Sequence, residues 1–344
     1  MKILIIGSGA IGCLIGALLK QAGKNVIFLD LPEIVNELSS KGITLEGFNQ
    51  TIRIQTPLTV SSLKGYSSYE MIVIAVKSFN TAAAIRHIPD YAAKKIISFQ
   101  NGIGNEEILA EKFGKYRIIA GTITYPVSSP ALGHVVIENQ KGGFGISPMD
   151  SKLDLTSVQK MLQREDIEVL LHNDYRSLKW SKLMLNIICN AVCAILGMPP
   201  EEIYSDRKLV WIEKKSVQEL LAVIKKKNIS IIDLPGYPIE LMRVAYSNLP
   251  PSLLKLALKK RIQKSRGDKK PSLYLDLEKG NRQTEIEFYN GAVVKEAKIL
   301  GIPSPINSTL TDVLKDITSG KISWDEFKGQ PEKLYQLCKD KTSK

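Results

Sequence analysis

Residues 2–12 read KILIIGSGAIG, a short apolar run that passes directly into a glycine-rich turn. The run KILII is typical of a buried parallel strand, and residues 10–22 carry the periodicity of an apolar helix. In a strand–turn–helix context, three glycines with the spacing G-x-G-x-x-G permit a tight turn, close approach of a pyrophosphate and close helix packing. The stretch therefore predicts a dinucleotide-binding loop. The predicted contacts are Gly7, Ser8, Gly9, Ala10, Ile11 and Gly12.

Asp30 follows the second predicted strand, residues 25–29, about twenty residues beyond this loop. A carboxylate at that place accepts hydrogen bonds from the ribose hydroxyls of adenosine, and it repels a 2′-phosphate. Leu31, Pro32 and Glu33 come next and supply no arginine. The residues alone favour NADH. The alternative is that Asp30 is a surface aspartate that ends the strand and does not contact the ribose.

The alternation of elements defines the expected fold class. Short β-branched runs occur at 2–6, 25–29, 71–76, 95–99, 117–124 and 133–146. From there the apolar pattern is helical, at 156–164, 177–196, 209–227, 239–263, 282–299 and 307–318. Strands alternating with helices predict an α/β fold with a doubly wound sheet, here followed by an all-α domain. We expect a Rossmann domain over 1–170 and an all-α substrate and catalytic domain over 171–344.

Composition excludes several protein classes. The 344 residues are 44% hydrophobic and 24% charged, which is typical of a globular chain. We see no apolar run of the roughly 18 residues that a membrane span needs, and the first residues read as a strand rather than a signal peptide. The four cysteines and three histidines fit neither a disulfide framework nor a metal site. We expect a cytoplasmic protein without a metal and without a membrane partner.

The net charge of +12 indicates anionic ligands, which include nucleotide cofactors and carboxylate substrates as well as nucleic acid. The densest basic stretch, residues 255–270, contains no aromatic side chain for base stacking. We therefore interpret it as a solvated helix face and loop, and we expect no nucleic-acid partner.

A polar stripe marks the predicted helix 177–196. Lys182, Asn186 and Asn190 recur every four residues among leucine, isoleucine, methionine and valine, so that one helix face should carry all three. Polar groups on an apolar helix need partners, which are either one another or a ligand. A polar seam between two domains therefore remains an alternative to a binding site.

Seven motifs in one order show that the sequence resembles the ketopantoate reductase family (2-dehydropantoate 2-reductases) along nearly its whole length. After the glycine loop come AVKSFNT with Lys77, SFQNGIGNEE with Asn101, WSKLMLNIICNAV with the polar stripe, PSLYLDLEKG with Ser272, TEIEFYNGAVV with Glu285, and GIPSPIN. The resemblance implies NADPH-dependent reduction of 2-dehydropantoate to (R)-pantoate, a step of pantothenate and coenzyme A biosynthesis.

The resemblance also implies residue roles, in a cleft between the two domains. Lys182 would give a proton to the carbonyl oxygen, and partial burial would lower its proton affinity. Asn186, Asn190 and Ser272 would bind the substrate, which is a small 2-oxo acid. Lys77 and Glu285 would contact the cofactor, and Asn101 would lie between nicotinamide and substrate.

Three departures from the family pattern leave other functions possible as interpretations of the sequence. No arginine follows Asp30, two prolines stand at 199–200, and both the segment 228–271 and the chain after 320 are extended. The alternatives are a reductase of another branched 2-oxo acid, a 3-hydroxy acid or opine dehydrogenase, and a non-catalytic protein, either a nicotinamide-binding sensor or a nucleic-acid binder that uses residues 255–270. The sequence is compatible with a monomer or a homodimer.

Overall fold

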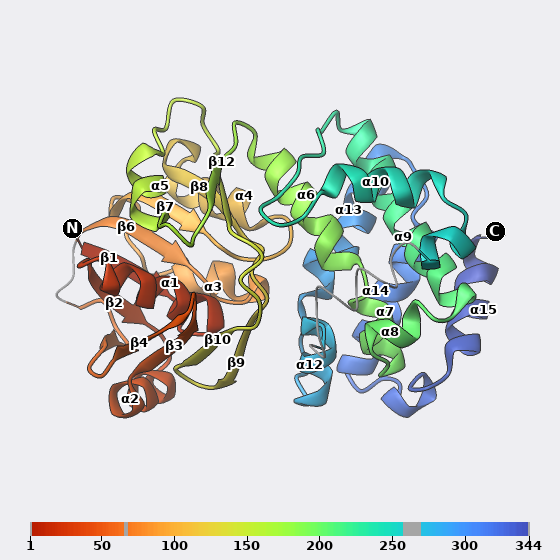
Figure 1. Cartoon of the computed structure of the whole chain (residues 1–344), viewed down its shortest axis with the longest axis horizontal. Helices are drawn as coiled ribbons and strands as arrows, with labels where there is room; N and C mark the ends of the chain where they lie inside the picture. Colours follow the sequence, from red (N-terminus) through yellow and green to blue (C-terminus); the bar gives the residue numbers. More distant parts are fainter. Residues whose placement is uncertain (1, 65–67, 257–269, 343–344) are drawn as a thin grey trace. The chain divides into compact units, whose positions relative to one another are not determined.

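The computed structural model describes residues 2–64, 68–256 and 270–342, which form two compact units (Figure 1). The first, here the sheet unit, comprises Met1–Lys179 and Leu234–Tyr237. The second, the helical unit, comprises Trp180–Asp233 and Pro238–Lys344. The chain passes from one to the other inside helix α6 (Tyr175–Ile187).

An eight-stranded sheet forms the centre of the sheet unit, in the order β12-β11-β8-β7-β6-β1-β2-β5 (Figure 1). Its strands are β1 (Lys2–Ile6), β2 (Asn25–Leu29), β5 (Leu58–Val60), β6 (Tyr69–Ile74), β7 (Ala93–Ser98), β8 (Ile118–Ile123), β11 (Phe144–Pro148) and β12 (Val169–Leu171). All neighbours are parallel except β8 and β11. The strand order reverses at β1, because β2 lies on one side of it and β6 on the other. Such a switch point is where doubly wound sheets bind ligands, at the carboxyl ends of the strands.

Helices cover this sheet and connect its strands. They are α1 (Ala10–Gln21), α2 (Pro32–Lys41), η1 (Ser78–Asn80), α3 (Thr81–Ile85), α4 (Asn105–Phe113), η2 (Lys115–Arg117) and α5 (Thr156–Leu162). The α/β class predicted from the alternating pattern is confirmed.

A second, four-stranded sheet was not expected from the sequence. Its order is β4-β3-β10-β9, with β3 (Ile43–Gly47), β4 (Gln50–Ile54), β9 (Val127–Ala131) and β10 (His134–Ile137). The prediction that residues 133–146 form one strand of the main sheet was therefore wrong, since only β11 joins that sheet. The physical reason is that α1 is apolar nearly all round, so it needs a cover on the side away from β1. Strands β3, β4 and β10 supply it.

The described part of the helical unit is all-α, as predicted. Besides the end of α6, it contains α7 (Ala191–Leu196), α8 (Pro200–Ile203), α9 (Arg207–Lys226), α10 (Ile239–Asn248), α12 (Ser272–Glu278), η3 (Glu285–Phe288), α13 (Asn290–Leu300), α14 (Pro305–Thr318), η4 (Trp324–Glu326) and α15 (Pro331–Thr342). The helix expected over 239–263 is interrupted after Asn248, because Pro250 and Pro251 follow. Residues 257–269, most of the basic stretch noted above, lie outside the described residues.

The predicted helix 177–196 is broken in the structure. It ends at Ile187 and resumes at Ala191, and Cys189 between them has a left-handed backbone with φ of 51°. The buried Glu213 carboxylate accepts the Cys189 N–H at 2.9 Å and so occupies a donor that a continuous helix would use. Asn190 therefore stands in the break and does not continue the face of α6.

Taken across this break, Tyr175–Leu196 is long and apolar enough to cross a membrane. The sequence analysis did not identify this segment, because its apolar residues are interrupted by polar ones. Burial is the deciding observation, because 89% of its most apolar window is inside the protein. It is thus the core helix of a globular fold.

Residues that follow α14 bind the last carbonyl groups of α7. The Trp324 indole N–H donates to the carbonyls of Ala194 (2.9 Å) and Ile195 (3.0 Å), and the Gly329 N–H donates to that of Leu196 (2.8 Å). The last carbonyl groups of a helix have no partner within the helix, so η4 and the residues after it act as its cap.

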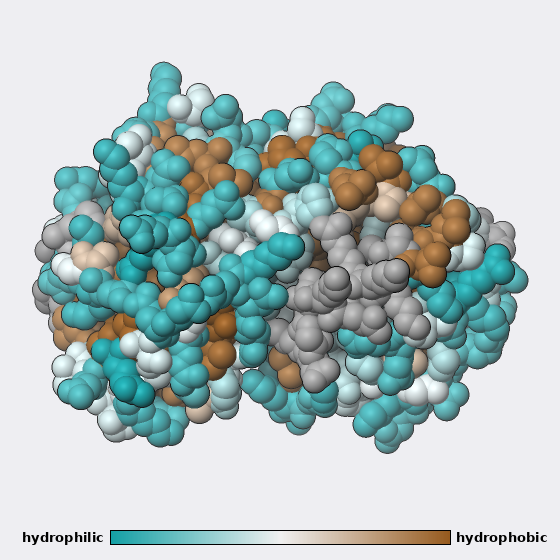
Figure 2. Space-filling view, in the orientation of Figure 1, coloured by the Kyte–Doolittle hydropathy of each residue, from teal (hydrophilic) through white to brown (hydrophobic). Residues whose placement is uncertain are grey.

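Exposed apolar side chains gather at α10 and just after it, where Figure 2 shows a brown area over the polar surface. They are Leu241, Val244, Leu253 and Leu256. None of the predicted site residues belongs to this group.

Candidate active site

The glycine loop joins β1 to α1, and the reason for a glycine differs among its three positions. Gly7 has φ of +95°, and a Cβ there would lie 2.7 Å from the Val76 nitrogen. A Cβ on Gly12 would lie 1.8 Å from the Gly7 carbonyl oxygen. These two positions need glycine for the turn and for packing, as predicted.

Gly9 is different, because a Cβ added to it would meet nothing within 4 Å. Its backbone angles, φ −71° and ψ −168°, are open to any residue. Packing within the protein therefore does not explain why this position lacks a side chain. Open space above a glycine at the start of a helix fits a bound pyrophosphate.

Donor groups at the start of α1 support that fit. Gly9 is the N-cap residue of α1, and within the described chain no side chain caps this helix. Among the described residues the Ser8 hydroxyl is buried and has no hydrogen-bond partner. Free N–H groups at a helix N-terminus and a buried hydroxyl suit the oxygens of a phosphate.

Asp30 lies beside this loop, just past the carboxyl end of β2. Its carboxylate accepts the backbone N–H of Ser8 and, at 2.8 Å, that of Leu31. Burial, with a smaller contribution from the Asp30 charge, raises the pKa of the nearby Cys13 thiol to about 12. Cys13 is thus an unreactive buried thiol, and all four cysteines are buried.

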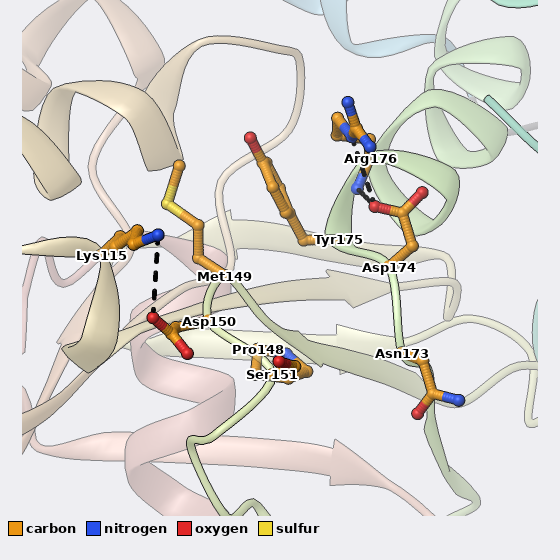
Figure 3. A pocket seen from close by; sticks show the side chains of 9 residues that line it. All are labelled: Lys115, Pro148, Met149, Asp150, Ser151, Asn173, Asp174, Tyr175 and Arg176. Carbon is orange, nitrogen blue, oxygen red and sulfur yellow. Dashed lines mark hydrogen bonds and ion pairs between the residues drawn. The ribbon is translucent and has the colours of Figure 1, made fainter. Parts of the chain in front are cut away.

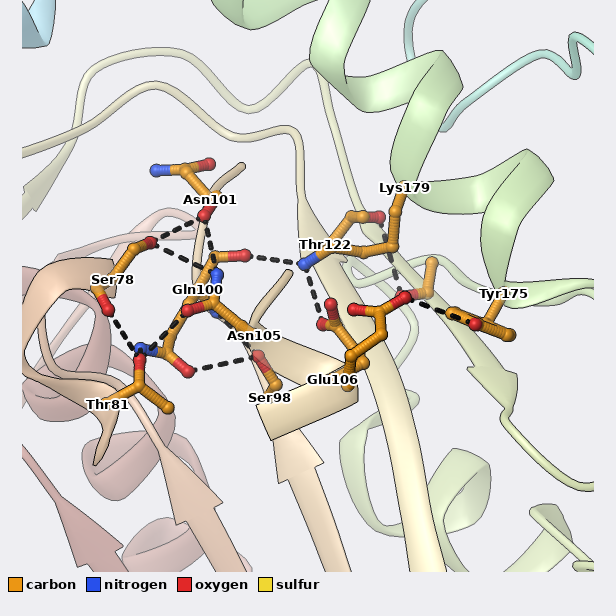
Figure 4. A network of polar contacts seen from close by, with 12 residues as sticks. Ser78, Thr81, Ser98, Gln100, Asn101, Asn105, Glu106, Thr122, Tyr175 and Lys179 are labelled. Carbon is orange, nitrogen blue, oxygen red and sulfur yellow. Dashed lines mark hydrogen bonds and ion pairs between the residues drawn. The ribbon is translucent and has the colours of Figure 1, made fainter. Parts of the chain in front are cut away.

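A network of hydrogen bonds fixes the loop that follows β7 (Figure 4). The Asn101 carbonyl accepts from Ser78 Oγ at 2.8 Å and from Asn105 Nδ2 at 3.0 Å. Gln100 Nε2 donates to the Val76 carbonyl at 2.9 Å and to Thr81 Oγ1 at 2.7 Å. The exits of β6 and β7, neighbouring strands, are therefore tied together at the same edge of the sheet.

Asn101 contributes only its backbone to this network. Its side chain points away from the other labelled residues (Figure 4) and is half-buried. Lys77, at the exit of β6 and directly before η1, is exposed. The sheet unit thus places the glycine loop, Asp30, Lys77 and Asn101 along the carboxyl edge of β1, β2, β6 and β7.

In the helical unit, Lys182 and Asn186 are half-buried and lie one turn apart on α6. Among the described residues, Asn186 Nδ2 is a buried donor with no hydrogen-bond partner. An unpaired buried amide costs free energy, so a group that accepts its N–H is expected.

The Asn190 side-chain amide has its hydrogen-bond partners within the protein. Its Nδ2 donates to the Asn186 carbonyl at 2.9 Å and to Ser272 Oγ at 3.3 Å, and its Oδ1 accepts the Leu273 N–H at 3.0 Å. Asn190 is only 7% exposed. It fixes the start of α12, and Ser272 with it, next to the break after α6.

Glu285 lies in the same unit and is buried. The hydroxyl of the buried Tyr289 donates to its Oε2 at 3.1 Å. Burial, followed by the Glu285 charge, holds the pKa of Tyr289 well above its usual value, and a hydrogen bond with Ser272 opposes this. Ser272, Tyr289 and Glu285 therefore form a cluster with Asn190, and Tyr289 is a member that sequence reasoning missed.

The pocket in Figure 3, with a volume of about 450 Å³, is not this site. It belongs to the sheet unit, and its lining contains none of the predicted site residues. Its charged side chains pair with one another, Lys115 with Asp150 at 3.9 Å and Arg176 with Asp174 at 3.4 Å. In the described part of the chain, no three His, Cys, Asp or Glu side chains are grouped to hold a metal.

The sheet order and the glycine loop of the sheet unit, followed by the helical unit, are typical of dinucleotide-binding proteins of the Rossmann class. Two family models match the chain: "Ketopantoate reductase PanE/ApbA" over residues 3–151 and "Ketopantoate reductase PanE/ApbA C terminal" over residues 174–318. The chain belongs to the ketopantoate reductase family.

Relatives and solved structures agree along nearly the full length. The 2-dehydropantoate 2-reductase of Archaeoglobus fulgidus is 27% identical, over 93% of this chain and 98% of the relative. The enzyme of that name from Pyrococcus horikoshii is 28% identical, over 92% and 97%. A ketopantoate reductase structure from Ralstonia eutropha (24% identity) and a D-mandelate dehydrogenase structure with NADH and anilino(oxo)acetate (20%) each have a TM-score of 0.78, over 93% of this chain and 99% of the other.

Proposed function

We propose that the protein reduces 2-dehydropantoate to (R)-pantoate with a reduced nicotinamide dinucleotide. The observation that carries this proposal is the buried, unpartnered Asn186 amide, which stands one turn from Lys182 on α6. This pair fits a substrate with a carbonyl to be protonated and an oxygen to accept an N–H. The full-length similarity to relatives named 2-dehydropantoate 2-reductase supports the choice of substrate.

The roles of the chain's own groups follow from their chemistry. A bound nicotinamide ring would supply a hydride to the ketone carbon. The Lys182 ammonium would stabilise the negative charge that develops on the carbonyl oxygen and then donate a proton to it. Asn186 Nδ2 would donate to a substrate oxygen. Ser272, positioned by Asn190, would donate to the carboxylate, and Asn101 would hold the nicotinamide.

On the cofactor side, the N–H groups at the start of α1 and Ser8 Oγ would hold the pyrophosphate over Gly9. Asp30 would accept from the ribose hydroxyls of adenosine, and Lys77 would contact the cofactor from the exit of β6. Glu285 would act through its cluster with Tyr289 and Ser272.

The direct test is the oxidation of NADH and NADPH, followed by absorbance, with 2-dehydropantoate as substrate. Other branched 2-oxo acids and an aromatic 2-oxo acid form the comparison arms. We expect the highest kcat/KM with 2-dehydropantoate. A higher value with another 2-oxo acid would assign that substrate instead, and binding of cofactor without any turnover would indicate a sensor.

Cofactor preference gives a first prediction. We expect the unmodified protein to use both cofactors, with NADH at least competitive, because the Asp30 carboxylate repels a 2′-phosphate. Repulsion between two charges about 4 Å apart near a surface is on the order of 1–4 kcal/mol, so Asp30→Ala should shift the preference toward NADPH by about tenfold or more. The ratio of kcat/KM values for the two cofactors measures this shift.

Asp30→Asn removes the charge and keeps one acceptor oxygen, so the amide can still accept the Ser8 N–H while it loses the hydrogen bond from the Leu31 N–H. Glu33→Ala is the matched control, since Glu33 is an exposed carboxylate in the first turn of α2. A preference for NADPH beyond about a hundredfold in the unmodified protein would show that Asp30 does not contact the ribose.

Substrate binding gives a second prediction. Asn186→Ala should raise KM for the oxo acid by about two- to twelvefold, the effect of one lost neutral hydrogen bond of about 0.5–1.5 kcal/mol. Ser272→Ala should act in the same direction. Initial rates at varied oxo acid and saturating cofactor measure the change.

The control for this variant is Asn281→Ala, which removes an exposed amide of the same unit that bonds to Asp276. A weaker affinity for nicotinamide cofactor with an unchanged oxo acid KM would assign Asn186 to cofactor binding instead.

A further inference from the structure

A buried ion pair joins α6 to α4 inside the sheet unit (Figure 4). Lys179 Nζ lies 2.9 Å from Glu106 Oε1, and the two side chains are 3% and 1% exposed. No other ion pair in the described part of the chain has both side chains buried to this extent.

Stability alone does not account for this pair. Removing two charges from water costs several kcal/mol per ion, and an apolar pair of similar volume is often as stable or more stable. An ammonium, unlike an apolar side chain, can donate hydrogen bonds to specific acceptors. Lys179 Nζ donates to the Gln100 carbonyl at 2.7 Å.

This hydrogen bond completes the fixation of the loop after β7. The Gln100 carbonyl is held by Lys179, and the next carbonyl, that of Asn101, is held by Ser78 and Asn105. These two carbonyls belong to the peptide planes on either side of the Asn101 Cα, so holding both fixes the backbone at Asn101. The direction in which the Asn101 side chain leaves the network is thereby set.

The strand order indicates which part of a dinucleotide this loop faces. Asp30 follows β2 on one side of β1, and the pyrophosphate loop follows β1 itself. The loop of Asn101 follows β7, on the opposite side of β1 from β2. When adenosine lies toward β2, the nicotinamide half extends over the exits of β6 and β7.

We propose that Lys179 is a positioning residue for the nicotinamide half of the cofactor: it orients Asn101 through the Gln100 carbonyl, with Glu106 as its counter-ion. The inference rests on the proposed function, because it takes a nicotinamide dinucleotide as the ligand. Lys179 itself touches neither cofactor nor substrate.

The experiment removes the donor and keeps the packing. Lys179→Met alone leaves Glu106 as an unpaired buried charge, so the main variant is Lys179→Met combined with Glu106→Leu. Lys179→Arg tests rescue, because it keeps a charged donor. Lys112→Met is the matched control: Lys112 also donates to a backbone carbonyl, that of Arg86 at 3.1 Å, and pairs with Asp90, but it lies at the far end of α4.

The readouts are turnover and the affinities for reduced cofactor and for ADP-ribose, which lacks the nicotinamide ring. In the double variant we expect kcat to fall by about ten- to hundredfold, the usual effect of a reacting group displaced by about 1 Å. The Kd of ADP-ribose should stay within about threefold of the unmodified value, and Lys179→Arg should recover part of the turnover.

Equal losses of affinity for the reduced cofactor and for ADP-ribose would show a general disturbance of the fold and overturn the proposal, as would an unchanged kcat in the double variant. If the unmodified protein does not reduce 2-dehydropantoate, the proposed function fails. The positioning role is then read from nicotinamide binding alone, as weaker binding of reduced cofactor beside unchanged binding of ADP-ribose.

Discussion

Lys182→Ala is expected to lower the rate of hydride transfer by about two to four orders of magnitude, the range for a lost general acid. The ammonium has two tasks in the proposed reaction, which are to stabilise the developing alkoxide and to supply its proton. Both act only in the transition state, so kcat and kcat/KM should fall together. Single-turnover oxidation of NADH or NADPH with 2-dehydropantoate measures the rate directly.

Cofactor affinity should hardly change in this variant, because Lys182 is assigned to the substrate carbonyl. Lys225→Ala is the matched control: it removes an exposed lysine from the last turn of α9 in the same unit. Turnover of Lys182→Ala within about threefold of the unmodified protein would show that another group donates the proton.

Gly9→Val should abolish most cofactor binding and leave the fold intact. The Gly9 backbone is in the extended region, and a Cβ there meets nothing within 4 Å, so the protein itself accommodates a side chain. The added carbons would fill the space proposed for the pyrophosphate. We expect the Kd of both cofactors to rise by at least about a hundredfold, equivalent to roughly 3 kcal/mol.

Gly12→Ala is the informative counterpart. Its Cβ would lie 1.8 Å from the Gly7 carbonyl oxygen, so the loop must move whether or not a cofactor is present. A destabilisation of about 1–3 kcal/mol by overpacking should lower its Tm by several degrees, whereas Gly9→Val, which changes the N-cap without a clash, should lower its Tm less. Normal cofactor affinity in Gly9→Val would place the pyrophosphate elsewhere.

The main sheet and the glycine loop could be predicted because their signals are local. A strand buried on both faces is a continuous apolar run, as at residues 2–6 and 25–29, and the three glycines sit at fixed spacing. The observed strands β1 and β2 begin and end at those residues. The helical class of the second unit could likewise be predicted from long periodic segments.

The second sheet could not be predicted in the same way. It pairs β3, in the first fifty residues, with β10, some ninety residues later, and β3 and β4 carry few apolar residues. The break before Asn190 was missed for a related reason. It depends on Glu213, a carboxylate of another helix, and nothing in the local sequence marks Cys189 as a left-handed position.

The candidate site was predicted in part. The residues named from the motifs fall into two groups, one along the carboxyl edge of the main sheet and one around the α6–α7 break. The residues that hold them, Lys179 and Tyr289 among them, were missed. A lysine three positions before Lys182 reads as a surface residue, and only the tertiary fold reveals that it is buried with Glu106.

The cap on α7 also bears on the order of events during synthesis. Trp324 donates to the carbonyl of Ala194, 130 residues before it, and Gly329 donates to that of Leu196, where the helix ends. A ribosome adds these capping residues long after α7 itself, so the last carbonyl groups of α7 wait for them during synthesis. A chain that is interrupted before Trp324 therefore lacks the cap of α7, and its helical unit stays incomplete.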